Sequence, residues 1–292
     1  MATICITGAT DGIGLATAER LLCAGHRVLV HARSEERGAP VVDRLAGDAV
    51  LVTSDLASLA EVEELADQVA RHGPIDVLVH NAGVWVRGGT PTTSVDGFET
   101  TFAVNVLAPH LLTARLADHL TGRLIWLGSG MAGSGHPDAE DPGARTDPKR
   151  AYADSKASDV LLASAWRRRL PQVASAAVDP GWVKTKLASA GAPGTVDTSA
   201  DSLVFLSTEV DAAQLDDGRY WRGRKAINIP KHLRDDSYAD ALAATCDQLA
   251  TRSARGSSPT RTNGRGTSGT AAGRRDSGTR SAPTASGRGE TR

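Results

Sequence analysis

Gly8-Ala9-Thr10-Asp11-Gly12-Ile13-Gly14 decides the fold of this chain, because the segment joins a short apolar run to a helical pattern. The apolar run covers residues 3–7, and the helical pattern ends near Cys23. A second apolar strand at 27–31 completes a βαβ unit of about thirty residues. Glycines let such a turn approach a pyrophosphate, which the N–H groups and the positive dipole of the helix N-terminus can bind. This stretch therefore predicts a nucleotide-binding α/β fold.

The residues after the second strand indicate which dinucleotide the turn accepts. An acid there would bind the ribose 2′-OH of NAD(H), but the chain reads His31-Ala32-Arg33-Ser34, with no carboxylate before Glu35. Arg33 can instead meet a 2′-phosphate, so we expect NADP(H), with NAD(H) as the less favoured cofactor. The alternative for Arg33 is an ordinary charged residue in a surface loop.

Strand and helix patterns go on alternating along the chain. They predict a single-domain, Rossmann-type, doubly wound parallel sheet. We expect its further strands at 49–53, 75–80, 123–127 and 174–178, and a helix opened by the pair Ser58 and Glu61. Ligands bind beyond the carboxyl ends of such strands, so the residues that follow them join the glycine turn on the cofactor rim. These residues are Asp55-Leu56, Asn81-Ala82-Gly83, Ser129 and Pro180-Gly181.

Tyr152 and Lys156 stand four residues apart in a segment with a helical pattern. Residues at this spacing share one helix face. A phenol is ordinarily a poor proton donor at neutral pH, and a nearby cation favours its phenolate form. The pair could therefore work as a general acid or base, whereas the alternative is a half-exposed tyrosine beside a solvated lysine.

Together these motifs resemble the short-chain dehydrogenase/reductase family in its single-domain form. The resemblance covers about residues 3 to 250. It rests on Thr7-Gly8-x-x-x-Gly12-x-Gly14, Asp55-Leu56, Asn81-Ala82-Gly83, Asn105, Ser129, Tyr152-x-x-x-Lys156 and Pro180-Gly181-x-Val183-x-Thr185. The glycine spacing is typical of members with redox chemistry on alcohols or carbonyls, whereas extended epimerase-like relatives usually show G-x-x-G-x-x-G.

The resemblance implies a catalytic role for four residues. Tyr152 would donate its proton to a carbonyl oxygen as NADPH delivers hydride, or take the alcohol proton in reverse. Lys156 would favour the phenolate and hydrogen-bond the nicotinamide ribose. Ser129 would polarise the substrate oxygen, or it would be only a turn residue at a strand end. Asn105 would anchor a water that connects Lys156 to solvent, or its amide would only satisfy helix backbone.

The resemblance also implies the cofactor-binding set, in which Val183 and Thr185 would contact the nicotinamide carboxamide. The full set is Thr7, Gly8, Asp11, Gly12, Ile13, Gly14, Arg33, Asp55, Leu56, Asn81, Ala82, Gly83, Tyr152, Lys156, Pro180, Val183 and Thr185.

Two segments depart from the commonest pattern of the family. Tyr152 follows Ser129 at a longer distance than usual, and we expect the polar insertion at 134–149 to loop out over the site. With Arg33, a closing strand at 218–221 and a helix at 235–249, this insertion is similar to the retinol-dehydrogenase-like branch, which acts on lipophilic carbonyls and alcohols. The short segment 186–197 leaves only a small lid over the substrate pocket.

Composition limits the class of protein. The 292 residues are 40% hydrophobic, and no apolar run reaches the roughly 18 residues of a membrane helix. The amino terminus enters an apolar strand without a basic leader, so we expect a cytoplasmic protein. Cys5, Cys23 and Cys246 form no C-x-x-C pair and are expected to be buried. The eight histidines form no H-E-x-x-H motif, so we expect no catalytic metal.

The net charge of −1 conceals a difference between body and tail. Residues from Arg252 onward carry +7, so the rest carries −8 and has no nucleic-acid footprint. We expect a catalytic domain over 1–252 and a disordered, dispensable tail over 253–292, because the tail is rich in Gly, Ser, Thr and Arg. The tail is either a solvated extension or an arginine-rich arm for RNA, a membrane or an acidic partner.

The sequence therefore predicts an NADP(H)-dependent oxidoreductase that acts on a small-molecule carbonyl or alcohol. A homodimer or homotetramer is possible, because the helices before and after Tyr152 often form the interface in this family. One alternative is an inactive nucleotide-sensing or scaffold protein, but such relatives usually lose the tyrosine or the lysine. A methyltransferase with a similar glycine loop would leave Tyr152 and Lys156 unexplained.

Overall fold

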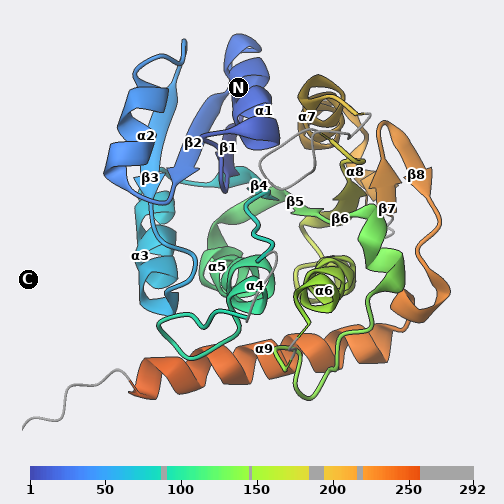
Figure 1. The fold of residues 1–292 in the computed structure, drawn as a ribbon. Helices are drawn as coiled ribbons and strands as arrows, with labels where there is room; N and C mark the ends of the chain where they lie inside the picture. The colour runs from blue at the N-terminus through green and yellow to red at the C-terminus, as the bar shows by residue number, and fades with distance from the viewer. Residues whose placement is uncertain (87–90, 145–146, 184–193, 216–219, 257–292) are drawn as a thin grey trace, which may run out of the picture. The chain divides into compact units, whose positions relative to one another are not determined.

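The computed structural model describes residues 1–86, 91–144, 147–183, 194–215 and 220–256. These residues build an eight-stranded sheet in the order β3-β2-β1-β4-β5-β6-β7-β8 (Figure 1). Neighbouring strands pair in parallel from β3 to β7, and only β8 is antiparallel to its neighbour. The strand order reverses between β1 and β4, which is where a doubly wound sheet binds its ligands. The expected Rossmann-type fold is confirmed.

The first half of the chain follows the βα alternation. Its elements are β1 (Thr3–Ile6), α1 (Gly12–Cys23), β2 (Arg27–Ala32), α2 (Glu35–Val42), β3 (Ala49–Thr53), α3 (Leu59–Ala70) and β4 (Ile75–His80). Every strand lies within one residue of the expected range. Ser58 caps α3 as expected by accepting a hydrogen bond from the Glu61 N–H, but the Glu61 carboxylate accepts from the Asp55 N–H and so does not complete the capping box.

The second half contains the helices that carry the expected catalytic residues. Two short π-helical stretches interrupt it, at Ala103–Leu107 and Phe205–Glu209. Its elements are α4 (Thr100–Phe102), α5 (Ala108–Leu116), β5 (Leu120–Leu127), α6 (Pro148–Arg169), β6 (Ala174–Asp179), α7 (Val196–Val204), α8 (Ala212–Leu215), β7 (Tyr220–Arg222), β8 (Lys225–Ile227) and α9 (Asp236–Gly256), with 3-10 turns at Ala117–His119, Gly130–Ser134 and Lys231–Leu233.

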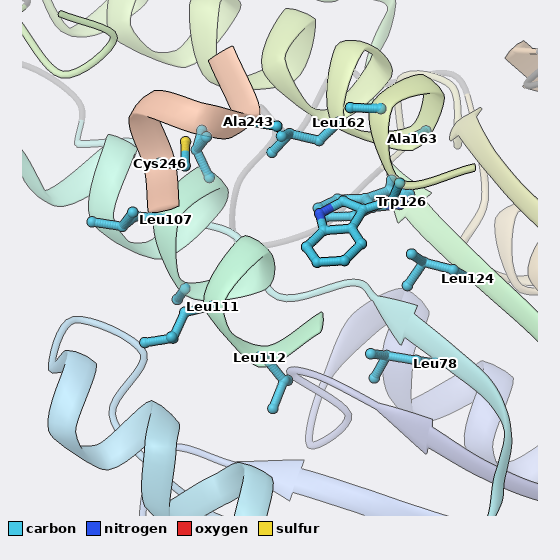
Figure 2. Packing of buried hydrophobic residues seen from close by; sticks show 14 of the residues in the cluster. Leu78, Leu107, Leu111, Leu112, Leu124, Trp126, Leu162, Ala163, Ala243 and Cys246 are labelled. Carbon is cyan, nitrogen blue, oxygen red and sulfur yellow. The ribbon is translucent and has the colours of Figure 1, made fainter. Parts of the chain in front are cut away.

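Helices cover both faces of the sheet, and each face has its own hydrophobic core (Figure 1). On one face, α1 and α7 pack side by side over β1, β2, β4 and β6. On the other face lie α3, α5 and α6, which share a hydrophobic core with Leu78, Leu124 and Trp126 of the central strands. Figure 2 shows the side chains of Leu112 from α5 and Leu162 from α6 in this core. Burial on both faces explains why the strands read as continuous apolar runs.

The last helix, α9, crosses α3, α5 and α6 on the outer side of that second layer (Figure 1). Ala243 and Cys246 of α9 are fully buried in the same core (Figure 2), and Arg168 of α6 binds Asp236 and Asp240. The expected helix is confirmed, and it extends to Gly256. Because α9 occupies outer surface of α5 and α6, subunits could associate through that surface only beside this helix or after displacing it.

The insertion before α6 does not loop out over the site in its described residues. Gly135 packs so closely on α6 that a Cβ atom there would lie 2.2 Å from the Ala153 carbonyl oxygen. The His136 N–H donates to Asp154 of α6, and the Tyr238 hydroxyl of α9 donates to the Pro137 carbonyl. The expectation was wrong because a polar composition does not exclude packing when backbone groups find partners on neighbouring helices.

Two of the three cysteines are buried as expected. Cys5 and Cys246 are buried, but Cys23 is exposed because it ends α1 on its solvent side. Among the described residues, no helix combines the length and the apolar character that a membrane crossing needs. The tail beyond Gly256 lies outside the described residues, so its predicted disorder remains a prediction.

Candidate active site

The glycine turn between β1 and α1 presses against the end of β4. Gly8 has a φ of 64°, and a Cβ atom there would lie 2.9 Å from the Ala82 Cα atom. A Cβ atom on Gly14 would lie 2.5 Å from the Asn81 amide nitrogen. Asp11 caps α1, since its carboxylate accepts from the Gly12 N–H at 2.7 Å. The turn thus needs glycine both for its backbone angles and for close packing.

Thr7 and Asn81 hold the ends of β1 and β4 together. The Thr7 hydroxyl oxygen accepts from the N–H groups of Asn81 and Ala82, both at 3.0 Å. In return, the Asn81 side chain donates to the carbonyl oxygens of Thr7 at 2.8 Å and Gly8 at 3.0 Å. These predicted cofactor residues therefore fix the shape of the rim at the switch point.

Arg33 lies at the predicted place beyond β2, but a carboxylate lies beside it. Its guanidinium donates two hydrogen bonds to one oxygen of Asp55, at 2.6 and 2.9 Å. The other Asp55 oxygen accepts from the Ala57 N–H. No acid follows β2 directly in the sequence, but the neighbouring strand β3 brings Asp55 to this place. Leu56, next in the chain, has its side chain in the hydrophobic core.

The catalytic candidates come from three elements that meet beyond β5. Tyr152 and Lys156 lie on α6, and the Lys156 ammonium is 5.9 Å from the centre of the Tyr152 ring. That ammonium donates to the Leu127 carbonyl at 2.8 Å and to the Asp159 carboxylate at 2.9 Å. Burial disfavours the ammonium, but Asp159 and Tyr152 outweigh this effect, so the pKa of Lys156 lies above its ordinary value.

Ser129 follows β5 and starts a 3-10 turn. Its hydroxyl oxygen accepts from the Met131 N–H at 3.2 Å, as a turn residue would. The Tyr220 hydroxyl of β7 holds the Ser129 backbone from both sides, because it donates to the carbonyl at 2.5 Å and accepts from the N–H at 3.2 Å. Burial raises the pKa of Tyr220, which keeps this phenol a hydrogen-bond donor.

Asn105 lies in the π-helical stretch between α4 and α5. Its side chain accepts from the Val84 N–H at 2.8 Å and donates to the Val84 carbonyl at 3.0 Å. It also donates to the Ser155 hydroxyl at 3.0 Å. The amide therefore clamps the loop after β4 to α6. A role in anchoring a water remains a prediction.

One pocket of about 990 Å³ brings together the catalytic candidates Ser129, Tyr152 and Lys156 and part of the predicted cofactor-binding set. Its walls include Ile13, Asn81, Gly83, Ser129, Tyr152, Lys156, Pro180 and Val183 from the predicted set. Four other predicted residues do not line the pocket but contact residues that do; these are Thr7, Gly8, Gly14 and Asn105. Arg33 and Asp55 form an ion pair at the ends of β2 and β3. Thr185 lies outside the described residues.

Several residues in this pocket were not predicted from the sequence, among them Trp85 and Arg222. Trp85 stacks on the Tyr152 ring, with ring centres 4.8 Å apart and planes 14° from parallel. Arg222 lines the pocket and donates to the buried Asp179 carboxylate at 2.6 Å. Asp159, the ion-pair partner of Lys156, was not predicted either, although its spacing of three from Lys156 was a signal, because side chains three apart on a helix are neighbours.

Comparison with known proteins fits this geometry. The short chain dehydrogenase family profile matches residues 2–194. The short-chain dehydrogenase chyC of Penicillium rubens is 35% identical over 258 residues, which cover 85% of this chain and 97% of that protein. Mouse retinol dehydrogenase 13 is 36% identical over 200 residues, which cover 62% of this chain and 59% of that protein.

Solved structures show the same likeness. A short chain dehydrogenase from Burkholderia cenocepacia, crystallised in complex with NADP, superposes with a TM-score of 0.62 at 26% identity. The match covers 75% of this chain and 94% of that one. The chain therefore belongs to the short-chain dehydrogenase/reductase family of oxidoreductases, which use nicotinamide cofactors.

Proposed function

We propose that this chain is an NADP(H)-dependent oxidoreductase that interconverts a lipophilic carbonyl compound and its alcohol, with Tyr152 as the general acid or base. The observation that carries the proposal is the convergence of Tyr152, Ser129 and Lys156 on one pocket that also includes Asn81 and Val183. The alternative of an inactive scaffold leaves this convergence unexplained.

The residues present fit a dinucleotide. The glycine turn leads directly into the N-terminus of α1, and the N–H groups in the first turn of that helix can bind a pyrophosphate. An ammonium has three donors, and Leu127 and Asp159 take two of those of Lys156, which leaves one for a ribose hydroxyl. The bound cofactor would supply the hydride.

The protein side chains would then manage the proton and the developing charge. In the direction of reduction, the Tyr152 hydroxyl gives its proton to the carbonyl oxygen as negative charge develops there. The Ser129 hydroxyl donates a second hydrogen bond to the same oxygen. For this, the hydroxyl hydrogen must point into the pocket, and it can do so because the hydroxyl oxygen only accepts from Met131. Lys156 favours the phenolate that remains.

The pocket favours an apolar substrate. Trp85, Met131 and Trp182 line it beside Tyr152, and the Trp182 side chain is exposed at this site. Contact between aromatic side chains of this kind and apolar ligand atoms removes apolar surface from water and so stabilises the complex. Retinol dehydrogenase 13, a relative of this chain, is named for a lipophilic alcohol.

Trp85→Ala is expected to lower kcat/KM for lipophilic carbonyls by about tenfold, because covering about 55 Å² of apolar surface contributes about 1.4 kcal/mol. The loss should be smaller for small carbonyls, which cover little of the ring. The measurement is kcat/KM for a homologous series of aldehydes of increasing chain length. Equal losses along the series would contradict a substrate-binding role for Trp85.

Arg33→Ala is expected to weaken NADPH binding by about ten- to a hundredfold and to change NADH binding little. A charge-assisted contact with the 2′-phosphate is worth about 1.5 to 3 kcal/mol, and NADH has no such phosphate. Asp55 shares the guanidinium, so the phosphate would have to compete with or join that carboxylate. The measurement is Kd for both cofactors at fixed ionic strength.

Arg37→Ala is the matched control, because Arg37 is an exposed arginine on α2 and its substitution removes the same charge. It should leave the ratio of the two Kd values near that of the parent protein. The assignment fails if Arg33→Ala weakens both cofactors equally, or if the parent protein prefers NADH.

A panel of carbonyls and alcohols tests the proposed function itself. Turnover is followed by nicotinamide absorbance with NADPH and with NADH. We expect NADPH oxidation with lipophilic aldehydes or ketones, and slower oxidation with NADH. A protein that binds NADPH but turns over no compound in either direction would instead support the sensor or scaffold alternative.

A further inference from the structure

The Lys156 ammonium has a buried counter-ion that the family motif does not include. Asp159 lies three residues further along α6, and its carboxylate accepts from the ammonium at 2.9 Å. The two side chains are only 5% and 4% exposed. The ammonium also donates to the Leu127 carbonyl at the end of β5. Lys156 is thus held by one charged and one neutral acceptor.

We propose that Asp159 is a positioning residue that acts through Lys156, because its carboxylate fixes the ammonium beside Tyr152 and offsets part of its charge. The inference rests on the proposed function of Tyr152 and Lys156. Asp159 itself touches neither the phenol nor the expected place of the substrate in the described contacts, and it is not among the residues that line the pocket.

Because the Lys156 side chain is buried, its protonation depends on its counter-ion. An ammonium moved out of water tends to lose its proton unless a partner stabilises the charge. Asp159 is the charged partner of Lys156 in the described structure, and the neutral Leu127 carbonyl cannot replace its charge. Burial raises the pKa of Asp159 to about 6, even though Lys156 favours the carboxylate form. The carboxylate is therefore charged above about pH 6, where it holds Lys156 protonated.

Several other groups face this pair and share its electrostatics. Tyr152 lies on the same helix, and the Tyr220 phenol of β7 is close enough for Asp159 to raise its pKa. Behind Tyr220, Asp179 and Arg222 form an ion pair. Asn105 and Gly83 approach from the other side, and both are neutral. Among these groups, a change at Asp159 acts most directly on Lys156, because the two are hydrogen-bonded.

The test is Asp159→Asn, which keeps the shape and one acceptor but removes the charge. Loss of the charge lets Lys156 deprotonate at lower pH, and it also leaves the protonated ammonium with a stronger pull on the Tyr152 proton. Both effects weaken reduction at high pH. We expect the alkaline limb of the kcat/KM profile for carbonyl reduction to move down by about 1 to 3 pH units, the range for a lost neighbouring charge.

Asp154→Asn is the matched control. Asp154 is an equally buried carboxylate on α6, but it stands two residues before Lys156, on the opposite helix side, and accepts from the His136 N–H. The alkaline limb of the kcat/KM profile of the Asp154→Asn variant should stay at the pH of the parent protein. An alkaline limb that also stays in place in Asp159→Asn, with or without a uniform loss of kcat, would overturn the proposal, because a purely structural role lowers the rate equally at every pH.

A thermal double-mutant cycle keeps the inference testable if Asp159→Asn folds poorly or if no carbonyl is reduced. Asp159→Asn should lower Tm clearly in the parent chain, because Lys156 then loses its buried counter-ion. In a Lys156→Met background, the same change should lower Tm much less or raise it. Equal shifts in the two backgrounds would contradict the pairing. Absence of turnover in the parent protein would instead refute the proposed function alone.

Discussion

Tyr152→Phe is expected to lower turnover by about 10²- to 10⁴-fold, the usual contribution of a positioned general acid. The change removes only the phenolic oxygen. The Phe ring can keep the stack on Trp85, whose ring centre lies 4.8 Å from that of Tyr152. Cofactor binding and Tm should therefore stay close to those of the parent protein. The measurements are kcat with the best carbonyl of the panel and the Kd of NADPH.

Tyr238→Phe serves as the control for removing a phenolic oxygen elsewhere. Tyr238 lies on α9, where its hydroxyl donates to the Pro137 carbonyl, and it does not line the pocket. Its turnover should equal that of the parent protein. If Tyr152→Phe kept turnover within a few-fold of the parent, the proton-transfer role of Tyr152 would be wrong.

Lys156→Ala is expected to impair two steps at once. The ammonium is proposed to bind the ribose, so the affinity for NADPH should fall by about ten- to a hundredfold, as for a lost charge-assisted hydrogen bond. Turnover at saturating cofactor should fall as well, because the cation that favours the phenolate is lost. The measurements are Kd for NADPH and the pH dependence of kcat.

The same change also leaves Asp159 buried without its cation, so some loss of thermal stability is expected. Lys149→Ala is the control. Lys149 is exposed in the first turn of α6, and its substitution removes an equal charge from the same helix. The proposed role of Lys156 fails if its variant keeps both the parent Kd and the parent pH profile.

The strands from β1 to β6 and their order of appearance could be predicted because each is an apolar run closed by a turn, whereas the short edge strand β8, Lys225–Ile227, has no such run and was not predicted. Parallel strands buried on both faces leave that signature in any sequence. The pattern failed for α2, where Gly38 and Pro40 interrupt the helical signal. A Cβ atom on Gly38 would lie 2.7 Å from the Ala32 Cβ atom, which is fixed to the backbone of β2, so glycine suits this close approach. The formation of α2 therefore depends on tertiary packing, which no local sequence pattern shows.

Part of the candidate site was predictable, namely the residues that belong to a recognisable motif at a strand end or on one helix face. Ser129, Tyr152 and Lys156 meet because the fold fixes where strand ends and α6 lie. Contacts across the sheet could not be foreseen, since the sequence does not give the distance between neighbouring loops. Asp55 reaches Arg33 from the next strand, and Trp85 reaches Tyr152 from the loop after β4.

Transfer of deuterium from the cofactor to the substrate distinguishes hydride transfer at this site from every other fate of NADPH. The protein is incubated with NADPH that carries deuterium at both C4 positions and with the best carbonyl of the panel, and the alcohol is analysed by mass spectrometry and NMR. We expect a single deuterium on the carbinol carbon for each NADPH oxidised, and almost no labelled alcohol with Tyr152→Phe. Alcohol without deuterium, or NADPH oxidised without any alcohol, would contradict hydride transfer at this site.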